Sequence, residues 1–444
     1  MRLQEIHIGL DDIDSPKGGC TTHFASLLVE QLSRQSIKWI DYPRLIRLNP
    51  GIPFRTRGNG AVALQLLFDT SRISDLIEQI EQMVHNYVDE TYPNTNPGAV
   101  IVTGEIPDSV QLLSQQALWR MIPIELAQRL VERYDIVHYK GGNGRGLIGA
   151  LASVGNALEH DHTYEFIAYR SMDQSGFKRG VEPESVLEMV ERMKDRVFSN
   201  IDPDEGRVLI EPHGPDPVIY GIRGEAATDV IEAAGLVRSK QDVDRWMVFR
   251  SNQATAEHLT HTMTIRDLRP YMACLVHGRV ESRPRIMEGG HVFFELGNDD
   301  ERIDCAAYEP TRGFREIVRG LRVGDEICVH ANVKPRSRTH GLTLNIEGLE
   351  ILNLGPDVLL VNPDCPHCLK RMKSAGSGKG FKCFRCGFKD RNAAKVEKRA
   401  ERTIKEGLHL PPLSAQRHLT RPLARINRSN SGRPEHLVSK WHSH

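Results

Sequence analysis

Residues 5–32 of the chain have the sequence EIHIGLDDIDSPKGGCTTHFASLLVEQL, which predicts a strand, a turn and a helix in that order. Ile6, Ile8 and Leu10 lie on one face of the strand, and an apolar stretch from about residue 22 to residue 32 predicts the helix. A turn that joins a strand to a helix N-terminus is a common phosphate site. This stretch therefore predicts an α/β domain with an anion site at its first turn.

The rest of the first domain, which we place at residues 1–135, continues the α/β pattern. Strands are predicted at 62–68 and 100–102, and apolar residues at helical spacing predict a helix over 75–88.

The chain has 444 residues, which predicts several domains because single cores stop growing at about 250–300 residues. Its 39% hydrophobic and 26% charged residues are typical of globular proteins, and no apolar run approaches the roughly 20 residues of a membrane span. The N-terminus lacks the apolar core of a signal peptide. We therefore expect a cytoplasmic protein with no membrane contact.

A second domain is predicted at residues 136–265. The candidate elements follow the order β-α-β-β-α-β of a ferredoxin-like fold. They are a strand at 163–169, a helix at 185–197, strands at 207–211 and 217–222, a helix at 226–237 and a strand at 245–249.

A third domain, at residues 266–355, is predicted to be a β-barrel with the OB-fold. Its five short apolar runs are ACLVHGRV, HVFFEL, IDCAAY, EICVHANV and LTLNIEGLEIL. A helix-like insertion at 314–321 fits the same fold, and a small SH3-like barrel is the alternative. The whole chain is thus predicted to be an α+β multidomain protein.

Two C-x-x-C pairs predict a zinc ribbon at residues 360–390. Cys365, Cys368, Cys383 and Cys386 have the spacing that lets four thiolates bind one tetrahedral zinc ion. A site with four thiolates is closed, which predicts a structural role, and His367 is then not a ligand.

The charge is distributed unevenly along a chain that is neutral overall. Residues 365–444 hold 19 Lys and Arg against 5 Asp and Glu, so their net charge is +14 and that of the other residues is −14. A basic C-terminal quarter suggests a bound polyanion, although a solvated tail is the alternative. Residues 391–444 are predicted to form a charged helix over about 391–406 and a basic tail whose last twenty residues are disordered.

The ribbon carries cations and aromatic rings, the groups with which proteins hold phosphates and stack on bases. The candidate RNA contacts there are Lys370, Arg371, Lys379, Lys382, Phe384 and Arg385. The alternative is that the phenylalanines form the small core of the ribbon.

The first turn predicts a nucleotide–magnesium site. Three carboxylates, Asp11, Asp12 and Asp14, follow the strand, and they are too close together to be buried without a partner. Gly18, Gly19, Thr21 and Thr22 offer backbone N–H groups and hydroxyls to phosphate. Ordinary turn chemistry with a threonine N-cap is the alternative, and the Walker motif is absent.

Two further loops pair arginine with glycine backbone, which suits an anionic ligand such as ATP. One holds Arg57 and Asn59, and the other holds Gly144 and Arg145. Hairpin turns are the alternative for each loop.

Beyond these motifs, the chain resembles the archaeal isoleucine tRNA 2-agmatinylcytidine synthetase family from end to end. The segments that carry the resemblance are 9–15, 20–22, 43–50, 56–60, 221–225, 251–255, 308–311 and 417–420. Leu10 and Ile13 depart from the Ile and Thr that the family has in its opening strand.

The resemblance implies an atypical kinase domain, a ferredoxin-like domain, an OB-fold and a zinc ribbon. It implies a ligase that uses ATP to replace the 2-oxo group of the wobble cytidine, in the CAU anticodon of isoleucine tRNA, with agmatine. The expected cofactors are ATP, Mg²⁺ at the first turn and Zn²⁺ in a structural role. AMP and phosphate are released, and the tRNA then decodes AUA. The family's phosphate-accepting threonine corresponds to Thr21.

The resemblance also suggests where the substrates bind. Glu225 and Asp242 are the candidates for binding agmatine, since its amine and guanidinium require carboxylates. The alternative is that each only pairs with a local arginine. Arg417 and Arg421 of the tail would hold tRNA with the ribbon and the OB-fold. No protein partner is evident from the sequence.

Two other functions remain open on the residues alone. One is a single-stranded nucleic-acid-binding protein without ligase chemistry, and the other is a simple kinase of RNA or of a small molecule that would release ADP.

Overall fold

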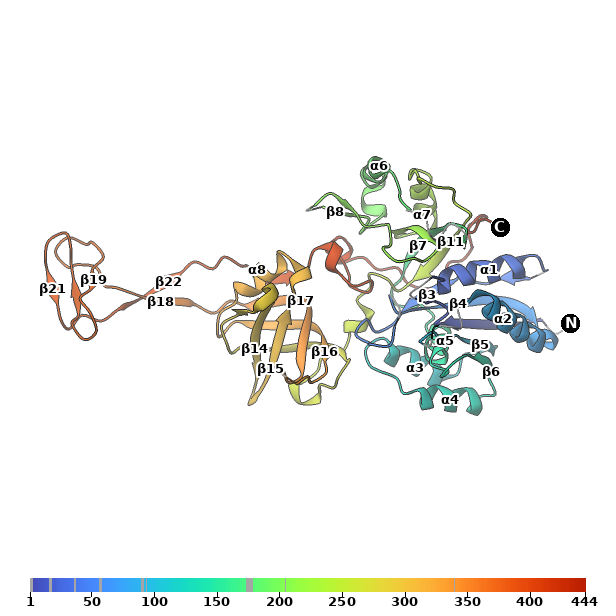
Figure 1. Ribbon diagram of the computed structural model, residues 1–444, viewed down its shortest axis with the longest axis horizontal. Coiled ribbons are helices and arrows are strands. Elements are labelled where there is room, and N and C mark those ends of the chain that lie inside the picture. The colour runs from blue at the N-terminus through green and yellow to red at the C-terminus, as the bar shows by residue number, and fades with distance from the viewer. Residues whose placement is uncertain are drawn as a thin grey trace.

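The computed structural model describes residues 3–15, 18–35, 37–55, 58–88, 92, 94–172, 179–203, 205–338 and 340–444. The molecule is elongated (Figure 1). The first two predicted domains form a body that holds both chain termini, the barrel lies next to it, and the zinc ribbon projects at the far end.

The first domain is built on strands β1 (Leu3–Asp11), β4 (Gly60–Asp69) and β5 (Gly98–Thr103). The strand β1 lies between the other two and is antiparallel to both. Helices α1 (Thr21–Ser33) and α2 (Ile73–Tyr87) follow β1 and β4 along the chain. The predicted strands and helices of residues 5–102 are therefore confirmed.

Alternate residues of these strands face two cores, as expected for a sheet that is covered on both sides. Ala99 and Ile101 pack with α1 and α2, whereas Val100 and Val102 pack with the helices on the opposite face. Those helices are α3 (Asp108–Ala117), α4 (Ile124–Arg133) and α5 (Gly146–Gly155). The short strands of this part are β2 (Lys38–Trp39), β3 (Arg44–Arg47) and β6 (Val137–Lys140).

The second domain shares its sheet with the first. The strand β3 pairs in parallel with β11 (Arg245–Ser251). The strand β11 pairs with β7 (Thr163–Tyr169), and β7 pairs with β10 (Val218–Gly224). Within the described residues these strands form one nine-stranded sheet. Helices α6 (Pro183–Met193) and α7 (Ala227–Ala234) pack on the same core as α1 and α2.

The predicted strand at 207–211 is wrong in its extent and partner. Only β9 (Arg207–Val208) forms there, and it pairs with β8 (Ile201–Asp202) outside the main sheet. Residues 209–213 follow as a loop, since Pro212 has no N–H to donate to a ladder. The helix predicted at 185–197 ends earlier, at Met193.

The third domain is a five-stranded barrel with the connectivity of an OB-fold. Its strands are β12 (Ala273–Val280), β14 (Val292–Asn298), β15 (Glu301–Ala307), β16 (Glu326–Lys334) and β17 (Thr343–Asn353). Strand β12 pairs with both β14 and β16, and β15 is parallel to β17, which closes the barrel. Helix α8 (Phe314–Arg319) lies between the third and fourth strands, as predicted. The small strand β13 (Arg285–Ile286) pairs with β14.

The helix predicted at 391–406 is wrong. Residues of β22 (Val396–Ala400) instead pair with β18 (Asp357–Val361) in a two-stranded stem that carries the ribbon (Figure 1). The segment has few apolar residues, so a helix there would have no face to bury, and helices draw most of their stability from such packing. The ribbon holds β19 (Lys373–Ser374), β20 (Phe381–Lys382) and β21 (Lys389–Asp390).

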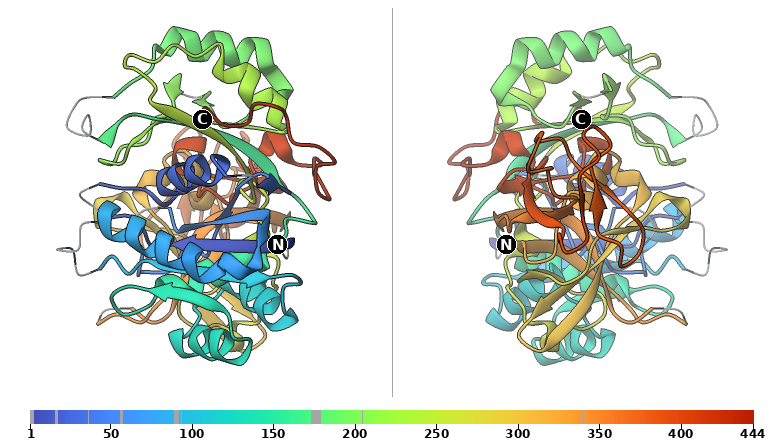
Figure 2. Two further views of the ribbon diagram at one scale, coloured as in Figure 1. Left: turned by 90° about the vertical axis from the view of Figure 1, so that its right-hand side faces the viewer. Right: turned by 90° about the vertical axis from the view of Figure 1, so that its left-hand side faces the viewer.

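The predicted disorder of the last twenty residues is also wrong. The strand β23 (Gly407–His409) pairs with β17. After it, the tail returns to the body and runs beside the second domain in both views of Figure 2. Trp441 is 5% exposed and packs edge-on against Trp39 and Tyr42. The body supplies the apolar partners that the tail itself lacks. Among the described residues, no helix has the length and apolar character needed to cross a membrane.

Candidate active site

A cavity of about 950 Å³ lies between the first and second domains. Its walls come from the end of β1, the start of α1, residues 50–55 and 58–60, the segment 207–218 and the tail at 413–420. Segments from both domains and from the tail therefore meet at one site.

The three aspartates of the first turn line this cavity. Asp12 adopts the left-handed conformation, with φ of 55°, where the strand ends. Its Oδ2 accepts hydrogen bonds from the backbone N–H of Asn96 at 3.0 Å and from the side-chain amide of Asn96 at 3.4 Å. This fixes one carboxylate oxygen of Asp12.

Asp11 is held against α5. A Cβ atom built on Gly149 would lie 1.9 Å from Asp11 Oδ2, so only glycine leaves space for this carboxylate. The helix α5 lies outside the range predicted for the first domain, yet it packs on β1, β4 and β5 and shapes the site.

Burial and mutual repulsion disfavour charge on these carboxylates. Burial raises the pKa of Asp11 well above its usual value, and Asp12 adds to the effect. Burial and then the charge of Asp14 raise the pKa of Asp12 to about 7. A bound cation would relieve both effects, because opposite charge favours the ionised form.

The carboxylates do not form a closed metal cage. Asp11, Asp12 and Asp14 do not bring three oxygen atoms within 4.8 Å of one another in the described structure. The three carboxylates therefore do not supply a complete set of metal ligands by themselves.

The threonines begin helix α1 and line the cavity. The N-cap is Cys20, without a side-chain capping bond, so neither threonine is the ordinary cap that was the alternative. Thr21 Oγ1 accepts a hydrogen bond from the N–H of Ile13 at 3.3 Å, and Thr22 Oγ1 hydrogen-bonds with Cys20 Sγ at 3.0 Å. Gly18 and Gly19 shape the turn without lining the cavity.

The two arginine–glycine loops meet at the cavity. Asn59 lines it and donates to the carbonyl of Asn49 at 2.8 Å. The guanidinium of Arg145 lies 4.4 Å from the ring centroid of Phe54, which belongs to the other loop. Gly144, which has a φ of 79°, does not line the cavity. Arg57 lies outside the described residues.

A cluster of cations lines another part of the cavity, and the residue patterns did not indicate it. Arg47 and Arg223 lie 3.8 and 3.5 Å from the buried carboxylate of Glu165. Arg223 also hydrogen-bonds with His418 Nδ1 at 3.1 Å. The Nε of Arg47 is buried without a hydrogen-bond partner in the described structure, whereas the Nε of Arg223 is the atom that lies 3.5 Å from Glu165 Oε1. Buried guanidinium groups gathered at a cavity wall are typical of a site that binds an anion.

The electrostatics of the cluster agree with that interpretation. Burial lowers the pKa of Arg47, and the guanidinium of Arg47 keeps the pKa of His418 well below its usual value. An anion placed here would offset the repulsion between these cations. The signal that could have found them was their position in the segments 43–50, 221–225 and 417–420, which resemble the family.

The two candidates for binding agmatine do not reach the cavity. Glu225 is bound by Arg425, with 2.8 Å between Oε1 and Nε, and Asp242 is exposed. The carboxylates of Glu211 and Asp216 line the cavity instead.

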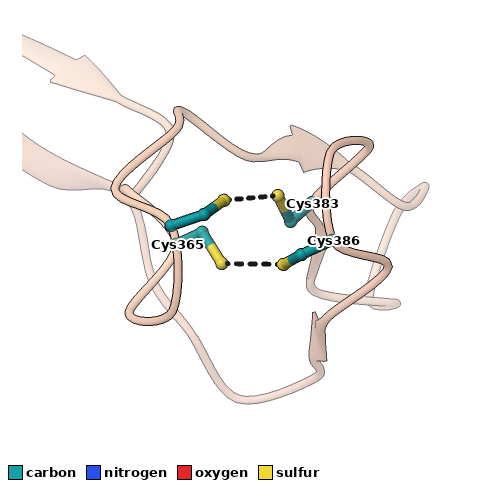
Figure 3. Close-up of side chains that lie close together, drawn as sticks. Cys365, Cys383 and Cys386 are labelled. Atoms are coloured by element: carbon teal, nitrogen blue, oxygen red, sulfur yellow. Dashed lines mark hydrogen bonds between the residues drawn. The ribbon is translucent and has the colours of Figure 1, made fainter.

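The four cysteines of the ribbon converge, as their spacing predicts (Figure 3). Their sulfur atoms all lie within 4.8 Å of one another, with 3.5 Å between Cys365 and Cys386 and between Cys368 and Cys383. Zn–S bonds of about 2.3 Å in a tetrahedron separate sulfurs by roughly 3.8 Å, so the residues fit zinc. His367 is exposed and packs on Phe388, away from the group.

The phenylalanines of the ribbon divide between its core and its surface. Phe381 is 8% exposed, whereas Phe384 is 70% exposed. The ammonium groups of Lys373 and Lys382 lie 5.2 and 5.6 Å from the centroid of Phe384. The other predicted contacts Lys370, Arg371, Lys379 and Arg385 are exposed.

The two tail arginines have partners inside the chain. Arg417 lines the cavity and lies 3.4 Å from Glu347. Arg421 is paired with Asp161 at 2.7 Å and contributes to anchoring the tail.

Family models match most of the chain. Residues 7–143 match the TiaS TCKD domain, residues 144–258 the TiaS FLD domain, and residues 362–404 the TiaS C-terminal zinc ribbon domain.

Two relatives are both named as the isoleucine tRNA 2-agmatinylcytidine synthetase TiaS. The protein of Cenarchaeum symbiosum is 38% identical over 427 residues, which are 96% of this chain and 94% of the relative. The protein of Archaeoglobus fulgidus is 39% identical over 422 residues, which are 95% and 98%.

Solved structures agree with these relatives. A crystal structure of TiaS in complex with its isoleucine tRNA and ATP has a TM-score of 0.85 and 37% identity. A crystal structure of TiaS with the same tRNA, AMPCPP and agmatine has a TM-score of 0.82 and 35% identity. Each comparison covers 96% of this chain and 98% of the other.

Proposed function

The chain belongs to the TiaS family of isoleucine tRNA 2-agmatinylcytidine synthetases, and we propose that it uses ATP to join agmatine to carbon 2 of the wobble cytidine of isoleucine tRNA. The tRNA carries the CAU anticodon and decodes AUA once modified. The observation that carries the proposal is that one cavity combines the aspartate–threonine turn with the arginine cluster.

The chemistry requires activation before substitution. The 2-oxo group of cytidine is a poor leaving group until it is phosphorylated, and the amine of agmatine then attacks carbon 2. AMP and phosphate are released. Phosphoryl transfer relies mainly on positioned charge, so the protein must hold phosphates and place cations on them.

Asp12 is the residue that would hold Mg²⁺, with Asp11 and Asp14 beside it, and bound Mg²⁺ would neutralise the charge that develops on the phosphates. The raised pKa values of Asp11 and Asp12 support this role, since two buried carboxylates need a cation to stay ionised. Thr21 is the proposed phosphate acceptor, because it lines the same cavity as the aspartates.

Arg47, Arg223 and Arg145 supply the cations for the phosphates of ATP or of the RNA backbone. The wobble base must leave its stack to enter the cavity, as in other enzymes that modify bases. The barrel and the ribbon, with Phe384 exposed between cations, would hold the remainder of the tRNA. Because the substrate is a tRNA, the cytoplasm is the proposed compartment.

The test is to incubate the protein with ATP, agmatine and a CAU-anticodon isoleucine tRNA, and to analyse the nucleotides and the wobble nucleoside. AMP together with an agmatine-bearing cytidine is the expected result. ADP alone would indicate a simple kinase, and tRNA binding without turnover would indicate a binding protein.

The aspartate turn can be tested separately. Asp12→Asn keeps the shape of the side chain and should lower turnover by at least about 100-fold, because it removes a charge that positions the reacting phosphate. Binding of tRNA should stay within about twofold. Asp108→Asn, an exposed carboxylate at the start of α3, is the control. Unchanged turnover in Asp12→Asn would exclude the proposed role.

A further inference from the structure

A second group of metal-ligating side chains lies in the OB-fold barrel, away from the cavity and the ribbon. Cys328 and His330 belong to β16, and Glu350 belongs to β17. One ligand atom of each residue, the thiol sulfur, an imidazole nitrogen and a carboxylate oxygen, lies within 4.8 Å of the other two.

The strand register places these side chains on one face. Cys328 is opposite Glu350 in the ladder between β16 and β17, and His330 is two residues further along β16. Side chains that are opposite, or two residues apart, point to the same side of a sheet. The intervening Val329 and its partner Leu349 belong to the core of the barrel, so the three ligands face outward.

The neighbouring strand adds a fourth candidate ligand. His277 on β12 is opposite Cys328 in the ladder between β12 and β16, and it is exposed. Hydrogen bonds between three consecutive strands thus fix the spacing of all four residues. Ligands on a rigid sheet need little ordering when a metal binds.

A glycine makes room for the histidine. Gly348 is opposite His330, and a Cβ atom there would lie 2.9 Å from Leu410 Cδ2 of the tail and 3.4 Å from His330 Nδ1. The imidazole can therefore lie across β17 beside Glu350. Cys328 is 2% exposed, and His330 and Glu350 are half-buried.

The polar groups of this cluster lack other side-chain partners. Across the residues described here, no hydrogen bond or ion pair joins the ring of His330 or the carboxylate of Glu350 to another side chain. Burial lowers the pKa of His330, and the nearby charge of Glu350 acts to raise it. Neither residue has a buried polar atom without a hydrogen-bond partner in the described structure, so the polar atoms of both reach solvent and are accessible to a cation.

We propose that Cys328, His330 and Glu350 form a second zinc site, distinct from the ribbon. Thiolate, imidazole and carboxylate are all zinc ligands, and three of them leave the fourth position open. Zinc bonds of about 2.0–2.3 Å require donor separations of roughly 3.4–3.6 Å. Side-chain rotations that move the ligand atoms by about 1 Å are therefore enough to bring them to these separations. Binding releases the protons of the thiol and of any protonated imidazole to solvent. Because the ligands come from two strands, the ion cross-links the barrel wall.

The test measures zinc in the full-length protein that already holds the ribbon ion. After dialysis against excess free zinc and desalting, the wild type should contain two zinc ions per chain by mass spectrometry. Glu350→Gln and His330→Gln should contain one. Glu326→Gln changes a half-exposed carboxylate on the same strand as His330, paired with Arg279 at 2.7 Å, and should still contain two.

A calorimetric zinc titration of the protein with one bound zinc gives a second measurement. The wild type and Glu326→Gln should each show one further site, and Glu350→Gln should bind at least about tenfold more weakly. His277→Ala shows whether that residue occupies the fourth position, and the proposal requires the further site to survive in it. One zinc ion in the wild type, no further site in the titration, or loss of the site in Glu326→Gln would each overturn the proposal.

Discussion

Replacing Gly149 with alanine should remove most of the activity of this protein without unfolding it. The added Cβ atom would lie 1.9 Å from Asp11 Oδ2 and 2.4 Å from Asp11 Cγ, whereas such contacts are essentially never shorter than 3.0 Å. Either the carboxylate of Asp11 moves by more than 1 Å or helix α5 moves away from the sheet. The first is easier, because a side chain rotates more readily than a buried helix shifts.

The expected loss follows from that displacement. Moving a positioned group by about 1 Å can cost roughly 100-fold in rate, so kcat for agmatine incorporation into tRNA should fall by about that factor. The substitution should not lower the free energy of unfolding much, since alanine in a helix is favoured over glycine by about 0.5–1 kcal/mol. The melting temperature should therefore stay within a few degrees of the wild type.

The assay is incorporation of labelled agmatine into a tRNA transcript, measured beside thermal unfolding. Gly313→Ala is the control, because that glycine lies in the barrel domain with no atom within 4 Å of the added Cβ. It should keep full activity. Turnover of Gly149→Ala within threefold of the wild type, with the protein folded, would refute the placement of Asp11 in the reaction.

Three further predictions concern the tail and the ribbon. Arg425, whose side chain is 0% exposed, pairs with Asp161 and Glu225, so Arg425→Met should cost about 3–5 kcal/mol in urea unfolding. Arg428→Met, whose partner Asp195 is exposed, should cost about 1 kcal/mol or less. Trp441→Ala should cost about 3–5 kcal/mol and expose the tail to protease, whereas Leu423→Ala at a 59% exposed site should do neither. Phe384→Ala should weaken tRNA binding by about 5-fold to 150-fold in filter binding at fixed salt, the value of one base stack, with Leu369→Ala, 80% exposed, as control. Wild-type affinity in Phe384→Ala would exclude stacking on this ring.

Local patterns predicted much of the fold. Alternating apolar residues gave β1, helical spacing gave α2, and the position of α8 between the third and fourth strands favoured the OB-fold over an SH3-like barrel. These predictions were correct because each element buries an apolar face of its own, and the spacing of the apolar residues on that face is visible in the sequence. The cysteine pairs are a similar case, since two residues between thiolates already position them for one metal.

Segments without an apolar face of their own were predicted wrongly. Residues 396–400 resemble a charged helix, but they pair with a strand that lies about 40 residues earlier in the chain. The last twenty residues contain few apolar side chains, but Trp441 fills a space between Trp39 and Tyr42. In both cases the stabilising partner is distant in sequence, so no local pattern reports it.

At the cavity, too, residues that are adjacent in the sequence could be predicted, whereas residues that are distant in the sequence could not. The aspartate–threonine turn was recognisable because its residues are adjacent, whereas Glu165 and Gly149 became part of the site only through packing. Glu225, the predicted ligand of agmatine, does not line the cavity and lies 2.8 Å from Arg425, which is 200 residues later in the chain. Buried charges depend on partners that the chain brings together only when it folds.

By itself, the sequence determined the type of each domain, the four converging cysteines and the aspartate–threonine turn that lines the cavity, because adjacent residues suffice for each. Only the tertiary structure decided that the first two domains share one sheet, that the tail closes a wall of the cavity, and that Arg47 and Arg223 face it. Those features rest on pairing and burial between residues up to about 370 positions apart. The free energy of such contacts depends on the whole fold, not on any local segment.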